Sequence, residues 1–158
     1  MHVTQAFKGK VIEISSKLGI QPDDLMAVMA FESRFDPAAK TKAPGGSATG
    51  LIQIIEARAN ELGTTTEALS KMSAVEQLKY VYAHLKPRAG DMKTLSNIYM
   101  AVFRPIAVGE PENEVLFKIG TEGYSGIAPL DIDGDGQITK AEATQMVINR
   151  RDSDYKKK

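Results

Sequence analysis

Apolar residues recur at helical spacing in the first part of the chain. One predicted helical face, within residues 4 to 18, carries Phe7, Val11, Ile14 and Leu18. Gly19 follows this stripe and is suited to end the helix. Pro22 and the two aspartates after it are typical of a first helical turn, because proline needs no N–H partner there and acids favour the positive end of the helix dipole. A second helix is therefore predicted from Pro22 to about Ser33.

Helical patterns continue through the middle of the chain. Five further helical pieces are predicted, at residues 50–62, around Ala68 and Leu69, from Ser73 to Leu85, at 94–103 and at 113–119. Ser73 and Glu76 have the spacing of a capping box, which supports the third of these. Residues 35–49 are rich in Pro, Gly and small polar residues and predict a long ordered loop. No strand pair is predicted, so the fold class is mainly α.

Composition narrows the class of protein. The 158 residues suit a single domain spanning 1–158, with 42% apolar and 25% charged residues. Twenty basic and twenty acidic side chains cancel, so neither nucleic acid nor an anionic membrane is an expected partner. Without cysteine there are no disulfides or thiol nucleophiles. No segment is apolar and long enough for membrane insertion, and a monomer is expected.

One acidic residue occupies an unexpected position on the second predicted helix. Leu25, Val28, Met29 and Glu32 share one face, so the Glu32 carboxyl lies on the stripe that should meet the core. Burial disfavours the charged form of a carboxyl group, which raises its pKa and keeps it protonated near neutral pH. Glu32 is therefore a candidate general acid. From helical position alone, a frayed helix end that reaches solvent is the simpler interpretation.

Two sequence motifs favour the interpretation of Glu32 as a catalytic acid. The segment Glu32-Ser33-Arg34-Phe35-Asp36-Pro37 resembles the first motif of the soluble lytic transglycosylases, which have a lysozyme-like fold. Residues 46–54, GSATGLIQI, resemble the glycine-rich segment of the same family. The resemblance implies that Glu32 is the catalytic acid/base and that Ser33, Ser47 and Gln53 position the sugar. The Gln53 amide can both donate and accept hydrogen bonds to hydroxyl and N-acetyl groups.

A third family motif is matched in part. It normally has a tyrosine followed by Asn-Ala-Gly, whereas here residues 97–105 read NIYMAVFRP, as in a divergent, phage-like variant. Tyr99 is the candidate that would hold the glutamate, or else a core aromatic residue. Met26 and Met100 could line a sugar cleft. His84 lies off the apolar stripe of its helix and is expected at the surface.

The sequence offers no convincing second catalytic acid. Asp36 is expected to cap backbone N–H groups, and Glu56, Glu61 and Asp91 are expected in solvated positions. The resemblance then implies cleavage of the MurNAc–GlcNAc β-1,4 bond of peptidoglycan by Glu32 alone, giving 1,6-anhydromuramoyl ends. A hydrolytic lysozyme on the same scaffold is the alternative. No cofactor is expected for catalysis.

Residues 131–142, DIDGDGQITKAE, carry the pattern of an EF-hand calcium loop, followed by a credible helix. The expected ligands of one structural Ca²⁺ ion are Asp131, Asp133, Asp135, Gln137 through its carbonyl, Thr139 through water, and Glu142. The glycines and the proline before the loop argue against a regular entering helix, so half an EF-hand is predicted. A calcium-dependent binding module without enzymatic activity is therefore a competing hypothesis.

The start of the chain has scattered polar residues and does not resemble a secretory signal. The expectation is synthesis in a host cytoplasm and delivery to the cell wall or periplasm by another agent. A phage endolysin, a virion-associated enzyme and a bacterial secreted factor all remain open.

Overall fold

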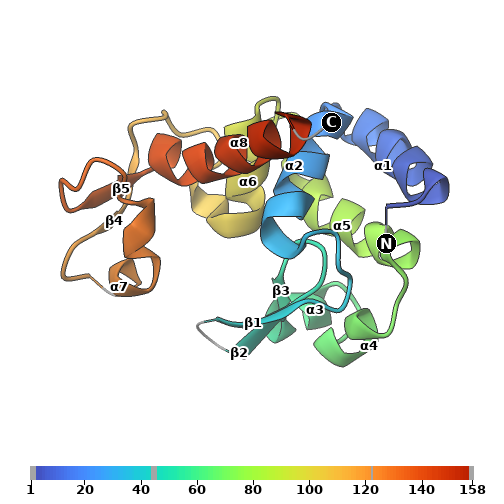
Figure 1. Cartoon of the computed structure of the whole chain (residues 1–158). Coiled ribbons are helices and arrows are strands. Elements are labelled where there is room, and N and C mark those ends of the chain that lie inside the picture. Colours follow the sequence, from blue (N-terminus) through green and yellow to red (C-terminus); the bar gives the residue numbers. More distant parts are fainter. Residues whose placement is uncertain (1–2, 44–45, 122, 157–158) are drawn as a thin grey trace.

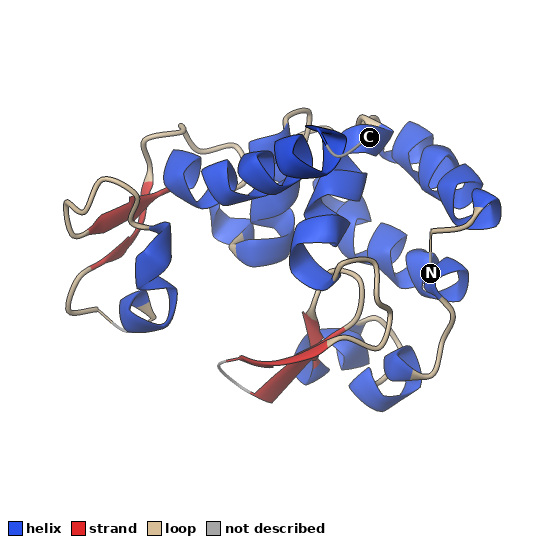
Figure 2. Ribbon diagram, in the orientation of Figure 1, coloured by secondary structure: helices blue, strands red, loops and turns tan. Residues whose placement is uncertain are grey.

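The computed structural model describes residues 3–43, 46–121 and 123–156 of the chain. Most of these residues are helical, and two small antiparallel sheets complete the fold (Figures 1 and 2). The α-helices are α1 (Gln5–Leu18), α2 (Pro22–Ser33), α3 (Glu56–Glu61), α4 (Thr66–Ser70), α5 (Ala74–Leu85), α6 (Leu95–Phe103), α7 (Tyr124–Ile127) and α8 (Lys140–Lys156). The strands are β1 (Lys40–Ala43), β2 (Gly46–Thr49), β3 (Ile54–Ile55), β4 (Val115–Lys118) and β5 (Gln137–Thr139). The mainly α prediction is confirmed.

The first two helices begin and end close to the predicted positions. The Thr4 hydroxyl accepts from the Phe7 N–H at 3.1 Å, which satisfies a donor in the first turn of α1. Gly19 ends this helix in the left-handed region with φ 70°. Pro22 opens α2, which runs to Ser33 as predicted. The four residues of the first stripe are all buried in the core.

Two later helices are also confirmed. Ser73 and Glu76 form the predicted capping box at the start of α5, with the Glu76 N–H donating to the Ser73 hydroxyl at 3.1 Å. Thr94 caps α6 in the same way, through the Asn97 N–H. Three-residue 3₁₀ turns follow at Lys86–Arg88, Pro105–Ala107 and Ala128–Leu130. Both α5 and α6 are therefore continued by a tight turn that contains a proline.

The long ordered loop predicted at residues 35–49 contains a strand pair, and the prediction that the chain has no strand pair is wrong. β1 and β2 form a hairpin in which Lys40 pairs with Thr49, and β2 continues to β3 through Thr49 and Ile54. Residues 44 and 45 lie outside the described residues. Strands of two to four residues are too short for an alternating pattern, which explains the error. The helix predicted from residue 50 begins only at Glu56.

The helix predicted at residues 113–119 is also wrong, because Val115–Lys118 is a strand. β4 pairs antiparallel with β5, and Lys118 lies opposite Gln137. A short apolar run does not distinguish a helix from a strand by its pattern. Here pairing with β5, a segment distant in the sequence, makes residues 115–118 a strand.

Packing joins the two ends of the chain. α8 contacts both α2 and α6, and crosses them along one side of the molecule (Figure 1). α1 packs on α5, while the β1–β3 sheet with α3 and α4 lies apart from the β4–β5 sheet and α7 (Figure 1). α2 and α6 therefore occupy the centre, between the two sheets. Within the described residues, no helix has the length and apolarity needed to cross a membrane.

Candidate active site

Glu32 is the penultimate residue of α2, at the point where the helix gives way to an unusual backbone. Arg34 and Phe35 have positive φ values of 53° and 65°, and Gln53 has 55°. Among the described residues these are the three non-glycine positions with positive φ, and all three lie in the two predicted motifs. Such conformations are costly and persist only where the surroundings impose them, so they cluster at functional sites. The backbone supports a site here independently of the motifs.

Ser33 ties the end of α2 to the glycine-rich segment. Its side chain is buried, and its hydroxyl lies within hydrogen-bonding distance of the carbonyl oxygens of Met29 (3.0 Å) and Leu51 (2.9 Å). The first contact is within the helix, whereas the second crosses to the other motif. Ser33 therefore fixes the end of α2, which carries Glu32, relative to Leu51, whereas the sugar-positioning role predicted for Ser33 stays a prediction.

The Glu32 side chain is partly buried, and this burial raises its pKa to about 7. Burial is the only cause of this shift among the described residues; neither a neighbouring carboxylate nor a cation contributes to it. At neutral pH a group with this pKa exists in both forms. It can therefore release a proton and take one back.

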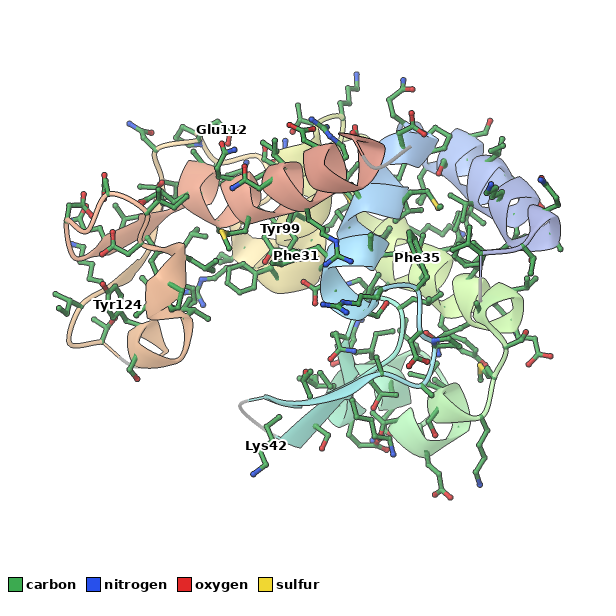
Figure 3. All side chains as sticks on the ribbon, in the orientation of Figure 1. Phe31, Phe35, Lys42, Tyr99, Glu112 and Tyr124 are labelled. Atoms are coloured by element: carbon green, nitrogen blue, oxygen red, sulfur yellow. The ribbon has the colours of Figure 1, made fainter. Side chains whose placement is uncertain are left out.

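Tyr99 lies beside this acid in the middle of α6. It is only 2% exposed, and burial raises its pKa, with the nearby Glu32 charge as the second cause. Its ring meets Phe31 edge to face at 5.7 Å and stacks on Phe103 at 5.3 Å. Figure 3 shows Tyr99 next to Phe31 in the centre of the molecule. Tyr99 is thus a core aromatic residue close to Glu32, and the prediction that it holds the glutamate stays a prediction.

The remaining predicted sugar-positioning residues differ in their surroundings. The Gln53 amide nitrogen donates to the carbonyl oxygens of Ala39 (3.1 Å) and Gly50 (2.9 Å), and its oxygen accepts from the Thr41 hydroxyl at 2.6 Å. Gln53 therefore stabilises its own loop against β1. Ser47 is exposed on β2. Sugar binding by Ser47 and Gln53 stays a prediction.

Gln77 is an anchoring residue that the sequence interpretation missed. It is 1% exposed on α5; its side-chain oxygen accepts from the Leu51 N–H at 2.6 Å, and its nitrogen donates to the carbonyls of Pro37 and Leu69, both at 2.9 Å. Gly50 has φ 93°, and a Cβ at Gly50 would lie 2.4 Å from the Gln77 oxygen. Close approach and backbone conformation thus both require glycine there. The position of this polar residue on the apolar face of its helix could have indicated the anchoring role, just as a similar position indicated the role of Glu32.

Three of the four other carboxylates considered as catalytic partners have structural contacts, and the fourth, Asp91, is exposed. Asp36 accepts from the Ala38 N–H at 2.9 Å, which is the capping role predicted for it. Glu56 accepts from the hydroxyl and the N–H of Thr66, and these bonds lower its pKa. Glu61 pairs with a neighbouring arginine at 2.8 Å. None of these contacts directs a second acid towards Glu32.

The expectation that His84 is a surface residue is wrong. Its Nε2 lies 2.8 Å from the Ala101 carbonyl, and its Nδ1 accepts from the Arg58 Nε–H at 3.0 Å. Burial lowers the pKa of His84, so the ring is neutral at physiological pH. It connects α3, α5 and α6 behind the site, which explains why a residue off the stripe is covered.

A second cluster forms around the predicted calcium loop. Carboxylate oxygens of Asp131, Asp133, Asp135 and Glu142 all lie within 4.8 Å of one another. The Asp131 Oδ1 atom is buried without a hydrogen-bond partner, while its Oδ2 accepts from the Tyr124 hydroxyl at 2.7 Å and the Gly136 N–H at 2.8 Å. Gln137 and Thr139 lie on β5, beside the cluster. Among the described residues, β4 occupies the position beside β5 that a second hand would fill.

The family comparison agrees with the first of these two sites. Residues 10–86 match the family described as Transglycosylase SLT domain. The match covers slightly less than half of the chain and includes Glu32 and the glycine-rich segment, whereas Tyr99 and the calcium loop lie outside it. This family comprises lytic transglycosylases, which are glycosidases that act on peptidoglycan. The chain therefore carries a lysozyme-like domain of the class of enzymes that degrade peptidoglycan. No curated protein matches the sequence.

Proposed function

We propose that the protein is a lytic transglycosylase in which Glu32 acts first as acid and then as base, cleaving the MurNAc–GlcNAc β-1,4 bond. The observation that carries this proposal is the pKa of about 7, raised by burial alone. A two-carboxylate glycosidase needs a second acid within about 5–10 Å of the first. A carboxylate so near and on the same cleft would also be expected to raise the Glu32 pKa by repulsion, and no described residue does so.

The reaction divides into two proton transfers. Protonated Glu32 gives its proton to the glycosidic oxygen, the bond from that oxygen to C1 of the muramoyl sugar breaks, and the sugar's own N-acetyl oxygen stabilises C1. The Glu32 carboxylate then takes the proton of the C6 hydroxyl while the C6 oxygen bonds to C1. Glu32 returns to its starting form and no water is consumed. Tyr99 is proposed to hold the carboxyl in position through the packing of its ring.

The hydrolytic alternative differs only in the nucleophile, because water would replace the C6 hydroxyl. Mass spectrometry of the muropeptides released by the purified protein separates the two reactions, since an anhydro end is lighter than a reducing end by one water. We expect anhydro products. Products that contain reducing ends alone would identify a lysozyme and exclude the transglycosylase.

Glu32→Gln tests the assigned acid. The amide has nearly the same shape but cannot donate and recover a proton, so cleavage should fall by at least about 100-fold. Glu114→Gln, at an exposed carboxylate in the segment before β4, is the matched control and should keep full activity. Activity of Glu32→Gln close to that of the control would remove Glu32 from the mechanism.

We also propose that the loop at residues 131–142 binds one structural Ca²⁺ ion. The fit rests on the converging carboxylates, on the buried and unpartnered Asp131 Oδ1 atom, and on the positive φ values of Gly134 (70°) and Gly136 (83°) that the tight loop requires. Glu142 is held at the start of α8, where it accepts from the Ile132 N–H at 2.8 Å. When bound, the ion supplies charge neutralisation and crosslinks the loop to α8. The proposed ion therefore stabilises the fold and takes no part in glycan cleavage.

Calcium titration of the purified protein tests the site directly. Calcium at about 100 times its dissociation constant should stabilise the fold by about 2.7 kcal/mol, visible as a higher melting temperature. Asp133→Asn should weaken the calorimetric binding signal, whereas Asp91→Asn, an exposed acid outside the loop, should leave it unchanged. A wild-type protein that shows neither binding heat nor a shift in melting temperature would rule out the calcium site.

A further inference from the structure

A pocket of about 320 Å³ lies beyond the part of the chain that matches the family, between the end of α6 and β4. It is lined by Arg104, Val115, Leu116, Phe117, Lys118 and Thr121. Among these described lining residues two are cationic and none is acidic. The remaining lining is apolar apart from one hydroxyl. The pocket is therefore suited to a ligand that carries both carboxylate groups and apolar groups.

Packing fixes one of the two cations. Arg104 follows the last residue of α6, and its guanidinium lies 4.7 Å from the centroid of the Phe117 ring. This cation–π contact holds the guanidinium at the pocket, and none of the hydrogen bonds among the described residues uses the N–H donors of this side chain. Lys118, the next residue along β4, is exposed and adds a second donor group at the same pocket.

The pocket is connected to the proposed catalytic site by aromatic contacts. The Phe117 ring lies 6.1 Å from the Phe103 ring, and Phe103 stacks on Tyr99 at 5.3 Å. Tyr99 in turn is close enough to Glu32 for its pKa to respond to the Glu32 charge. Two ring contacts therefore separate the wall of the pocket from the neighbour of the catalytic acid. The two centroid distances place the Phe117 ring within about 11 Å of the Tyr99 ring, a span that three or four extended peptide residues cover.

We propose that the pocket binds the peptide stem of peptidoglycan, with Arg104 and Lys118 contacting its carboxylates. This inference rests on the proposed function. The stem is attached to the muramoyl sugar whose bond is cleaved, so it must lie close to Glu32 during the reaction, and it carries both free carboxylates and methyl groups. The phosphodiester of a wall polymer is the other anionic candidate. It is disfavoured because it would occupy the C6 oxygen, which the transglycosylase reaction requires as a free hydroxyl.

The test separates peptide binding from glycan binding. Dissociation constants are measured in the Glu32→Gln background for three kinds of soluble glycan strand. The first bears peptides, the second is the same strand after an amidase has removed the peptides, and the third carries phosphodiesters of a wall polymer. Arg104→Met with Lys118→Met removes both charges and keeps side chains of similar length. Lys8→Met is the matched control, on α1 at the opposite end of the molecule from β4 (Figure 1).

We expect the double variant to bind peptide-bearing strands about three- to tenfold more weakly, since exposed charge pairs contribute modestly. Binding of the stripped strands, and of the Lys8→Met variant to any of the strands, should not change. An equal loss on peptide-bearing and stripped strands, or a loss only on strands that carry phosphodiesters, would overturn the proposal. If the parent protein cleaves stripped strands to anhydro products and binds peptide-bearing and stripped strands equally, the proposed function stands and this inference fails.

Discussion

Glu32→Gln should make the protein more stable, and only at pH values where the glutamate is charged. The pKa of Glu32 is raised from its ordinary value of 4.5 to about 7 in the folded protein. Unfolding therefore releases a proton between these two values, and stability falls as pH rises through this window. Glutamine has no charge to bury, so its contribution does not change with pH.

The magnitude follows from the shift. A difference between 4.5 and about 7 corresponds to an upper limit of about 3 kcal/mol of lost stability above pH 7, and to a few tenths of a kcal/mol at pH 4.5. Because the Glu32 side chain is only partly buried, water recovers part of this cost. We expect a gain of about 1–2 kcal/mol for the glutamine variant at pH 8. At pH 5 the two proteins should differ by less than about 0.5 kcal/mol.

Urea denaturation of both proteins at pH 5 and pH 8 measures the four free energies of unfolding, with Glu114→Gln as the control for a surface amide. The difference in free energy of unfolding between variant and wild type is calculated at each pH, and the two differences are then compared. A difference that is the same at both pH values would show that Glu32 is not buried as a neutral acid. The proposed mechanism would then lose its supporting observation.

Three further substitutions test the supporting structure. Gly50→Ala should destabilise the fold by about 2–4 kcal/mol, measured by urea denaturation, and should lower glycan cleavage. Gly90→Ala is the control, because Gly90 has φ 100° but nothing lies within 4 Å of its Cβ position, so this variant measures only the cost of the backbone conformation. Equal costs for the two variants would contradict the clash with Gln77. Lys140→Met should lower the free energy of unfolding by about 1–3 kcal/mol, because this side chain is 1% exposed and connects α6 to the loop before β4. Thermal unfolding measures the effect, and an unchanged melting temperature would contradict that role. The pKa of His84 is lowered in the fold, so the free energy of unfolding of the wild-type protein should decrease as pH falls below 6.5. His84→Gln should abolish this decrease. A variant that keeps the wild-type pH dependence would assign the decrease to another group.

Local chemistry made the helices predictable. Capping side chains set the starts of α1, α5 and α6, and Pro22 opens α2. The buried stripes of α1 and α2 follow from spacing alone. The same reasoning placed Glu32 on a core-facing stripe, and the structure gives it the raised pKa expected there. These features depend on residues that are close in the sequence.

Features that depend on distant partners could not be predicted. β4 is a strand because β5 pairs with it, and residues 115–118 alone are compatible with either structure. His84 is covered because α3 and α6 meet there and provide Arg58 and the Ala101 carbonyl. Gln77 is held by three segments separated from it by 8, 26 and 40 positions. Only the fold brings such groups together.

The isolation of Glu32 from other charges is what fits it to two opposite tasks. A neighbouring cation would lower its pKa and weaken it as an acid, and a second carboxylate would raise the pKa and weaken it as a base. Burial alone sets the pKa near 7, where the acid can give its proton to the glycosidic oxygen and the carboxylate can still take one from the C6 hydroxyl. In a hydrolase the two tasks are usually divided between two acids with separated pKa values. A single acid of intermediate strength is therefore better matched to anhydro-sugar formation, in which the substrate supplies the nucleophile.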